Sequence, residues 1–389
     1  MLQTGALARS MPLVATASVA ADSPDVAGRL AEGLGPGPFA VVVLFISPLA
    51  DLGALTAGLR VFGAVPVIGC TTAGEISGAG YAEGQVVALA LPVAHFAVDT
   101  LLVPDLGAIA AQDMIGRLIR ARMGLMRGRP GWEHEFAFLM VDGLSVREDE
   151  LTAALAAGLG PLPLFGGSAG DGVRFRQTFV LHGGVMRSHA AVVAVVRSDC
   201  RVKVFNLDHL VPTGRRMVVT EADPVRRIVR QINAEPAAQE YARLLGKDPA
   251  QLTAFTFAAH PLVVRIGGRH HVRAIQQVAA NGDLVFYSAI DEGLVLTLAE
   301  PQDMVAHLGV ELAKLSVGGA PEAILACDCI LRRMEAQEKQ MTGEISALLR
   351  QHRVTGFSTY GEQFNSMHVN QTMTGVAIYA PDPPVRAMP

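Results

Sequence analysis

Cysteine, aromatic residues and charge are all scarce in this chain of 389 residues, which has 4 cysteines, 5% aromatic and 17% charged residues. The cysteines are Cys70, Cys200, Cys327 and Cys329. They lack the paired spacing of a zinc ribbon, a redox C-x-x-C motif or a c-type haem attachment site. We therefore expect buried thiols in a protein of a reducing compartment.

A basic surface and a membrane-spanning run are also missing. The formal net charge is -4 and no basic run is interleaved with aromatic residues, which argues against a nucleic-acid partner. The first 20 residues hold one arginine and an apolar run diluted by Thr and Ser, which makes a poor signal peptide and is too short to span a bilayer. The predicted location is the cytoplasm, without membrane attachment.

Half of the residues are apolar, enough for two packed domains. Short apolar runs alternate with amphipathic segments, which predicts an α/β (α+β) fold of mixed sheets flanked by helices. Phe39–Ser47 has the composition of a strand buried on both faces, and Ser47 and Pro48 predict the start of a helix. Turn residues near Gly214 place the domain boundary between 1–214 and 215–389. No long linker separates the two domains, so we expect them to pack closely.

Helices are predicted in four segments of the second domain. The patterns favour helices at Asp223–Asn233, Ala237–Gly246, Pro301–Ser316 and Arg332–Gln351.

One turn pattern is repeated along the chain. Val65–Glu75 ("VPVIGCTTAGE") and Arg353–Glu362 ("RVTGFSTYGE") both contain G-x-[ST]-T-x-G-E, and Phe165–Asp171 ("FGGSAGD") is a version one position shorter. Each copy follows apolar residues and precedes a strand-like segment, which predicts one strand–turn–strand unit used three times.

Two interpretations of these turns stay open. Glycine permits positive φ and hydroxyl side chains satisfy turn amides, so the copies are either turns of fixed geometry or the walls of one shared pocket. On the second interpretation the ligand contacts are Thr71, Thr72, Glu75, Ser168, Asp171, Thr359 and Glu362.

Gly166–Gly170 also matches the G-x-S-x-G nucleophile elbow of hydrolases, with Ser168 as nucleophile. That motif needs a helix directly after the serine, whereas the residues that follow are strand-like. A phosphate loop is disfavoured because no Gly-Lys-[ST] follows any copy.

Histidine and arginine complete the candidate set. No histidine pair has the i, i+4 spacing of a helical zinc site, but a single axial haem ligand needs no spacing pattern. His260 and His368 are the candidate haem ligands. Arg332 could pair with Glu362 or a ligand carboxylate, and Asn370 is the remaining predicted ligand contact.

Several motifs together resemble the FIST family of sensory proteins. They are "VPVIGCTTAGEISGAGY", "PLFGGSAGD", "HLVPTGRRMVVTEAD", "INAEPAAQEYARLLG", "CDCILRRMEAQ" and "GFSTYGEQF". The ending "YGEQFNSMHVNQTMTGVAIY" is similar to the stand-alone branch of haem-based nitric-oxide sensors (NosP-like). The resemblance implies FIST N-terminal and C-terminal domains, and a small ligand such as nitric oxide bound to haem or an amino-acid-like molecule. It also implies a separately encoded partner, a histidine kinase or a cyclic-di-GMP enzyme.

We therefore predict a cytoplasmic, non-catalytic sensor that binds haem through a histidine. The alternative is an amino-acid-like ligand held without haem by Thr71, Thr72, Glu75 and an arginine, and a third hypothesis is a serine hydrolase using Ser168. The sequence leaves open whether the protein forms a homodimer.

Overall fold

A computed structural model describes residues 12–266 and 268–381. Residues 1–11 of the N-terminal segment that makes a poor signal peptide lie outside this range. Within the described residues, one unit of strand, helix, strand, helix, strand, hairpin and strand occurs three times. This confirms the predicted repeat of strand–turn–strand units.

Unit 1 comprises β1 (Ala15–Ala20), α1 (Val26–Leu34), β2 (Phe39–Ile46), α2 (Leu52–Gly58), the 3-10 helix η1 (Leu59–Phe62), β3 (Val67–Thr71), β4 (Glu75–Ser77), β5 (Gly80–Ala82) and β6 (Gln85–Pro92). Unit 2 comprises β7 (Phe96–Val103), α3 (Ala111–Gly128), β8 (His134–Val141), α4 (Glu148–Leu159), β9 (Leu164–Ser168), β10 (Val180–His182), β11 (Val185–Arg187) and β12 (Ala191–Ser198). Unit 3 comprises β13 (Cys200–Leu207), α7 (Met304–Leu315), β22 (Ala323–Cys329), α8 (Ile330–Glu338), α9 (Thr342–Gln351), β23 (Val354–Thr359), β24 (Glu362–Phe364), β25 (Met367–Val369) and β26 (Met373–Pro381).

The three units exchange their hairpins in a cycle. The six-stranded sheets have the orders β1-β6-β2-β3-β10-β11, β7-β12-β8-β9-β24-β25 and β13-β26-β22-β23-β4-β5. Unit 1 thus receives the hairpin of unit 2, unit 2 that of unit 3, and unit 3 that of unit 1. In each sheet the second and third strands of the unit are parallel, and the neighbouring pairs are antiparallel.

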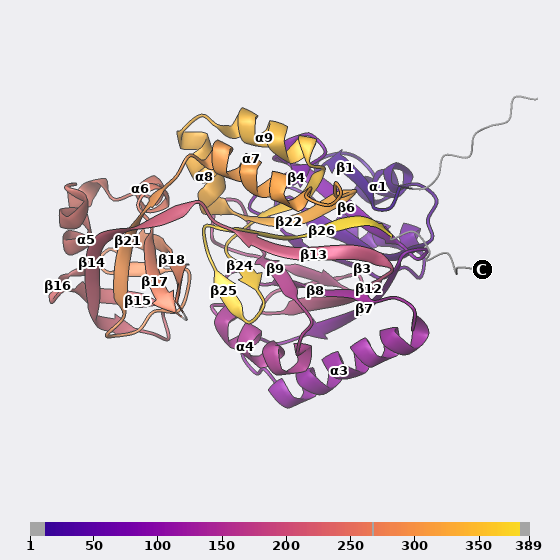
Figure 1. Ribbon diagram of the computed structural model, residues 1–389, viewed down its shortest axis with the longest axis horizontal. Coiled ribbons are helices and arrows are strands. Elements are labelled where there is room, and N and C mark those ends of the chain that lie inside the picture. Colours follow the sequence, from indigo (N-terminus) through magenta and orange to yellow (C-terminus); the bar gives the residue numbers. More distant parts are fainter. Residues whose placement is uncertain (1–11, 267, 382–389) are drawn as a thin grey trace, which may run out of the picture.

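The three sheets share one core between them. Apolar side chains from all three units meet there, including stacked pairs of Phe45 with Phe357 and of Phe138 with Phe165. The helices cover the outer faces: α1 and α2 pack on the first sheet, α3 and α4 on the second, and α7 and α9 on the third. Figure 1 shows these layers in the larger, right-hand body of the molecule.

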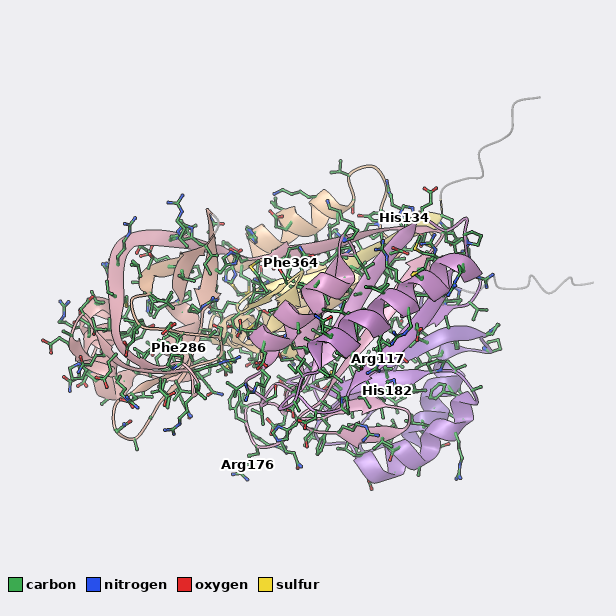
Figure 2. The ribbon with its side chains drawn as sticks, turned by 90° about the horizontal axis from the view of Figure 1, so that it is seen from below. Arg117, His134, Arg176, His182, Phe286 and Phe364 are labelled. Atoms are coloured by element: carbon green, nitrogen blue, oxygen red, sulfur yellow. The ribbon has the colours of Figure 1, made fainter. Side chains whose placement is uncertain are left out.

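A smaller domain is inserted between β13 and α7. It comprises β14 (Leu210–Asp223), β15 (Ile228–Ile232), β16 (Glu235–Pro236), α5 (Ala237–Leu245), the 3-10 helix η2 (Pro249–Gln251), α6 (Ala254–Ala259), β17 (Leu262–Ile266), β18 (Arg269–Arg273), β19 (Ile275–Val278), β20 (Leu284–Phe286) and β21 (Val295–Pro301). It stands to one side of the larger body in Figure 1, and in Figure 2 Phe286 marks it, apart from Arg117 and His182. The predicted boundary at residue 214 lies inside β14 and stays a prediction.

Two of the helix predictions are wrong. The segment Asp223–Asn233 is a turn followed by β15, in which Val229 and Ile232 are buried in the core of the inserted domain. The segment Arg332–Gln351 is broken between α8 and α9, where Gln340 has a φ of 57°. No helix in the described part of the chain is long and apolar enough to cross a bilayer.

Candidate functional site

The repeated turns stand at equivalent places in the three units. Each turn comes directly after the carboxyl end of the third strand of its unit (β3, β9 or β23). That strand runs parallel to the second strand of the unit. In units 1 and 3 the turn leads directly into the hairpin that the unit gives away. Unit 2 reaches its hairpin through a longer loop, which accounts for the missing position in "FGGSAGD".

Backbone hydrogen bonds join the three turns in a ring. The amide of Ala73 donates to the carbonyl of Ser358 (2.9 Å), that of Tyr360 to Ser168 (3.2 Å), and that of Gly170 to Thr71 (3.0 Å). Each bond links a different pair of turns, so the three copies meet at one place. The ring satisfies backbone groups that would otherwise be buried without partners.

A hydroxyl–carboxylate pair closes two of the turns. Thr72 donates through Oγ1 to Oε1 of Glu75 at 2.5 Å, and Thr359 makes the same bond to Glu362. Burial raises the pKa of both acids, that of Glu362 to about 8, despite the hydroxyl and amide donors around them. Glu362 therefore holds its proton at neutral pH.

Asp171, the acid of the second turn, differs from Glu362 because its pKa is lowered and its carboxylate is ionised. Burial pushes its pKa upward, but donors outweigh burial and the pKa is lowered. These donors are the hydroxyl of Tyr360 and the amides of Phe175, Arg176 and Gln177. The ionised Asp171 thus fixes the loop after β9.

All of the predicted ligand contacts are buried, with exposed fractions of 5% or less. Most of them face protein atoms, in agreement with turns of fixed geometry. Two turns, however, also line a cavity of about 250 Å³ beside α8, called here the α8 cavity. The cavity is lined by Ser47, Pro48, Leu49, Ala73, Gly74, Glu75, Glu83, Gly84, Asp171, Gly172, Val173, Arg174, Ile330, Arg333, Met334 and Gln337.

The position of this cavity favours ligand binding. It lies beyond the carboxyl ends of the parallel strands β2 and β3, where open α/β sheets commonly bind ligands. Its lining includes the charged residues Arg333, Glu83 and Asp171 and the apolar residues Ile330 and Met334. Two other cavities, of about 400 and 440 Å³, contain none of the predicted site residues.

Arg333, and not the predicted Arg332, reaches the α8 cavity. Its Nη2 donates to the carbonyl of Ala82 (2.8 Å) and to Glu83 (3.2 Å), and its guanidinium lies over the ring of Tyr81. Glu83 is 72% exposed in its side chain, so a ligand carboxylate can replace it at modest cost. Ile330, Arg333, Met334 and Gln337 follow the i, i+3, i+4, i+7 pattern of one helix face, a signal in the sequence that would have identified this arginine.

Arg332 belongs to a buried network instead. It donates through Nε to Asp328 (2.7 Å), and its Nη1 lies 2.8 Å from Nδ1 of His209. His209 in turn pairs with Glu335 through Nε2 at 2.9 Å. His209 stands in the link between β13 and the inserted domain, so this network connects α8 with that domain.

His368 and Asn370 lie against the third turn. Nδ2 of Asn370 donates to the carbonyl of Tyr360 (3.5 Å), and the His368 ring touches Gly361. Burial lowers the pKa of His368, so the ring is neutral, and its Nε2 has no hydrogen-bond partner among the described residues. A buried, neutral and unpaired imidazole nitrogen has the donor chemistry of an axial haem ligand.

The space beside His368 does not fit a porphyrin. A β-carbon at Gly361 would lie 2.8 Å from Nε2 of His368, so backbone fills the position beside that nitrogen. His260 follows α6 within the inserted domain and is half-buried. Neither histidine lines the α8 cavity or the two larger cavities. Haem binding stays a prediction of the sequence.

Ser168 ends β9 and has the surroundings of a structural residue. Its Oγ accepts a hydrogen bond from Nε2 of Gln363 at 2.9 Å, and it is fully buried. The residues after it form a loop rather than the helix that a nucleophile elbow requires. In its sheet, Ser168 pairs with Val141 in the way that Thr71 pairs with Ile46, so the serine is the equivalent of a turn threonine.

Comparison with known families accounts for most of the chain. A family model described as the FIST N domain matches residues 40–235, and a model described as the FIST C domain matches residues 237–365. A search of curated proteins finds no match. The division between the two family models falls after β15, within the inserted domain. FIST domains are found in sensors that bind small ligands in signal transduction. Because the match to the FIST N domain alone spans more than half of the residues of this chain, the chain belongs to the FIST family.

Proposed function

We propose that this FIST protein senses a small amino-acid-like ligand with an apolar side chain, bound in the α8 cavity without haem. The observation that carries the proposal is that the lining of this cavity combines charged and apolar side chains. Arg333 can receive a carboxylate, and Asp171 and Glu83 can receive an ammonium group. Ile330, Met334 and Leu49 give the side chain an apolar wall.

The size of the cavity supports the same class of ligand. A volume of about 250 Å³ is below the roughly 300–1,000 Å³ typical of drug-sized ligands and suits a single amino acid. Leu49 and Val173 at its edge are 62% and 65% exposed, so apolar surface is available to a ligand that enters.

Helix α8 supplies a route from the ligand to the rest of the molecule. Arg333 faces the cavity while Arg332 and Glu335, on the same helix, hold His209 at the entry to the inserted domain. A ligand that shifts α8 would change these contacts and with them the position of the inserted domain. We propose that a separately encoded histidine kinase or cyclic-di-GMP enzyme responds to this change, in the cytoplasm.

A thermal-shift screen of the purified chain against the common amino acids tests the proposal. A ligand present at 100 times its Kd adds about 2.7 kcal/mol to the unfolding free energy, so Tm should rise. The rise in Tm should disappear in Arg333→Met. It should persist in the matched control Arg353→Met, which removes an exposed arginine that pairs with Glu322. Absence of a shift with every amino acid, or an equal shift in Arg333→Met, would contradict the proposal.

The haem hypothesis is tested on the same protein. Addition of haem should produce no Soret band that depends on His260 or His368. A band that moves with nitric oxide and is lost in His368→Ala would favour the haem sensor over the amino-acid sensor.

A further inference from the structure

A cluster of three possible metal ligands lies at the junctions between the units. His95 is in the turn between β6 and β7, which links units 1 and 2, and Asp199 and Cys200 join β12 to β13, which links units 2 and 3. A ring nitrogen of His95, a carboxylate oxygen of Asp199 and Sγ of Cys200 all lie within 4.8 Å of one another.

The His95–Asp199 and Asp199–Cys200 distances match those in a tetrahedral zinc site. Zn²⁺ binds nitrogen and oxygen at about 2.0–2.1 Å and sulfur at about 2.3 Å, so tetrahedral angles place N and O about 3.3 Å apart and O and S about 3.5 Å apart. In the protein Nδ1 of His95 is 3.1 and 3.2 Å from the two oxygens of Asp199, and Sγ of Cys200 is 3.5 Å from Oδ1.

The backbone around the cluster holds the ligands in place. The hydroxyl of Ser198 donates to the carbonyl of His95 (2.8 Å) and accepts from the amide of Cys200 (3.0 Å). Ser198 thereby fixes the two junctions relative to each other. Prior positioning of ligands lowers the cost of ordering them when a metal binds.

Exposure of the cluster leaves room for the ion and for a further ligand. The side chains of His95 and Asp199 are 35% and 31% exposed, whereas Cys200 is buried beneath them. The ion would thus have protein on one side and solvent on the other. This is the arrangement of a site with an open coordination position.

A nucleophilic cysteine explains the cluster less well. In a Cys–His pair the imidazole takes the thiol proton directly. Here the thiol of Cys200 contacts Asp199, and His95 contacts the same carboxylate from the other side. The carboxylate is central, which suits three ligands around an ion.

We propose that His95, Asp199 and Cys200 bind Zn²⁺, with water as the fourth ligand. One nitrogen, one oxygen and one sulfur ligand are a set that Zn²⁺ accepts, and thiolate selects against Mg²⁺ and Ca²⁺. On binding, Cys200 releases its thiol proton to solvent, and His95 takes the tautomer that carries its proton on Nε2, by exchange with solvent. Nδ1 of His95 and the Asp199 carboxylate then exchange their hydrogen bond for bonds to the metal.

The ion would join the two junctions at an end of the larger body away from the inserted domain. His134 pairs with Ser198, the residue before Asp199, and in Figure 2 His134 lies far from Phe286 of the inserted domain. The site is therefore separate from the α8 cavity, whose lining contains none of the three ligands.

Cobalt binding to the full chain tests the site directly. The protein is stripped with a chelator, desalted and titrated with Co²⁺. We expect one equivalent to bind, with a thiolate-to-cobalt charge-transfer band in the near ultraviolet and the intense visible bands of tetrahedral Co²⁺, and Zn²⁺ should displace it.

Variants assign the ligands. Cys200→Ala should lose the charge-transfer band, whereas Cys70→Ala, which removes another buried thiol, should keep it. His95→Ala and Asp199→Asn should weaken Zn²⁺ affinity at least about tenfold, since loss of an outer-shell partner alone costs about 10–100-fold. His352→Ala is the control for histidine.

Two results would overturn the proposal. One is the absence of the charge-transfer band in the wild-type protein. The other is an unchanged Zn²⁺ affinity in Asp199→Asn. Asp199 is partly exposed and asparagine has the same shape as aspartate, so this substitution should leave the fold intact. Circular dichroism of each variant establishes that it is folded.

Discussion

The guanidinium of Arg333 lies directly against Gly74, so closely that a β-carbon at Gly74 would be 2.3 Å from Nη1. The contact joins the first repeated turn to helix α8 and forms one wall of the α8 cavity. It also explains why glycine stands at this position of the turn, where φ is 130°.

Gly74→Ala should lower the unfolding free energy by about 1–3 kcal/mol, because the new methyl group meets Arg333 and the backbone is held in a strained region. Urea unfolding measures the change. Gly78→Ala in the same hairpin is the matched control, since no heavy atom of the described residues lies within 4 Å of its β-carbon and its φ is not positive. Equal stability of the two variants would show that Arg333 does not occupy this position.

The buried acid Glu362 should make stability depend on pH. Its pKa is raised from 4.5 to about 8, so above pH 4.5 the native state keeps a proton that the unfolded chain has lost. The unfolding free energy should therefore fall as the pH rises from about 4.5 to 8, with a slope of up to about 1.4 kcal/mol per pH unit, and level off above that.

Denaturant unfolding of the wild type and of Glu362→Gln across this range measures the effect. The glutamine variant should lose this part of the pH dependence, whereas Glu322→Gln at an exposed position should keep it. If Glu362→Gln and the wild type have parallel profiles, Glu362 is ionised in the native state.

Removal of Arg332 should be strongly destabilising. Arg332→Met leaves Asp328 buried without its cationic partner, and breaking a buried pair in this way costs about 3–5 kcal/mol. The exposed pair of Arg353 and Glu322 contributes about 0–1 kcal/mol, so Arg353→Met provides the comparison in the same unfolding assay. A loss below 1 kcal/mol for Arg332→Met would contradict a stabilising role for this buried pair.

The periodic patterns of the sequence predict the repeated parts of the fold well. The run Phe39–Ser47 is the fully covered strand β2, and the three related turns identify the three units. The start of α2 was missed by a few residues, because Asp51, and not Ser47, caps it. Either residue type is a good N-cap, and only the geometry of the turn between them decides.

Contacts between distant segments could not be predicted from the same patterns. The segment Asp223–Asn233 has a helical composition, but pairing of β15 with β14 and β20 overrides it. The exchange of hairpins depends on which sheet edge is free, and the cluster of His95 and Asp199 joins residues 104 positions apart. Spacing motifs detect ligands only when the ligands are near in sequence.

The cyclic exchange of hairpins also sets an order of completion during synthesis. The first sheet is complete once β11 has emerged at Arg187, but the second waits for β25 and the third for β26, which ends at Pro381. Until β23 is made, the hairpin of unit 1 has no edge strand to pair with, and until β24 is made, β9 exposes the edge that β24 later covers. A ribosome that stalls inside unit 3 would therefore release a chain with unpaired strand edges, and such chains should be the ones that chaperones hold and proteases remove.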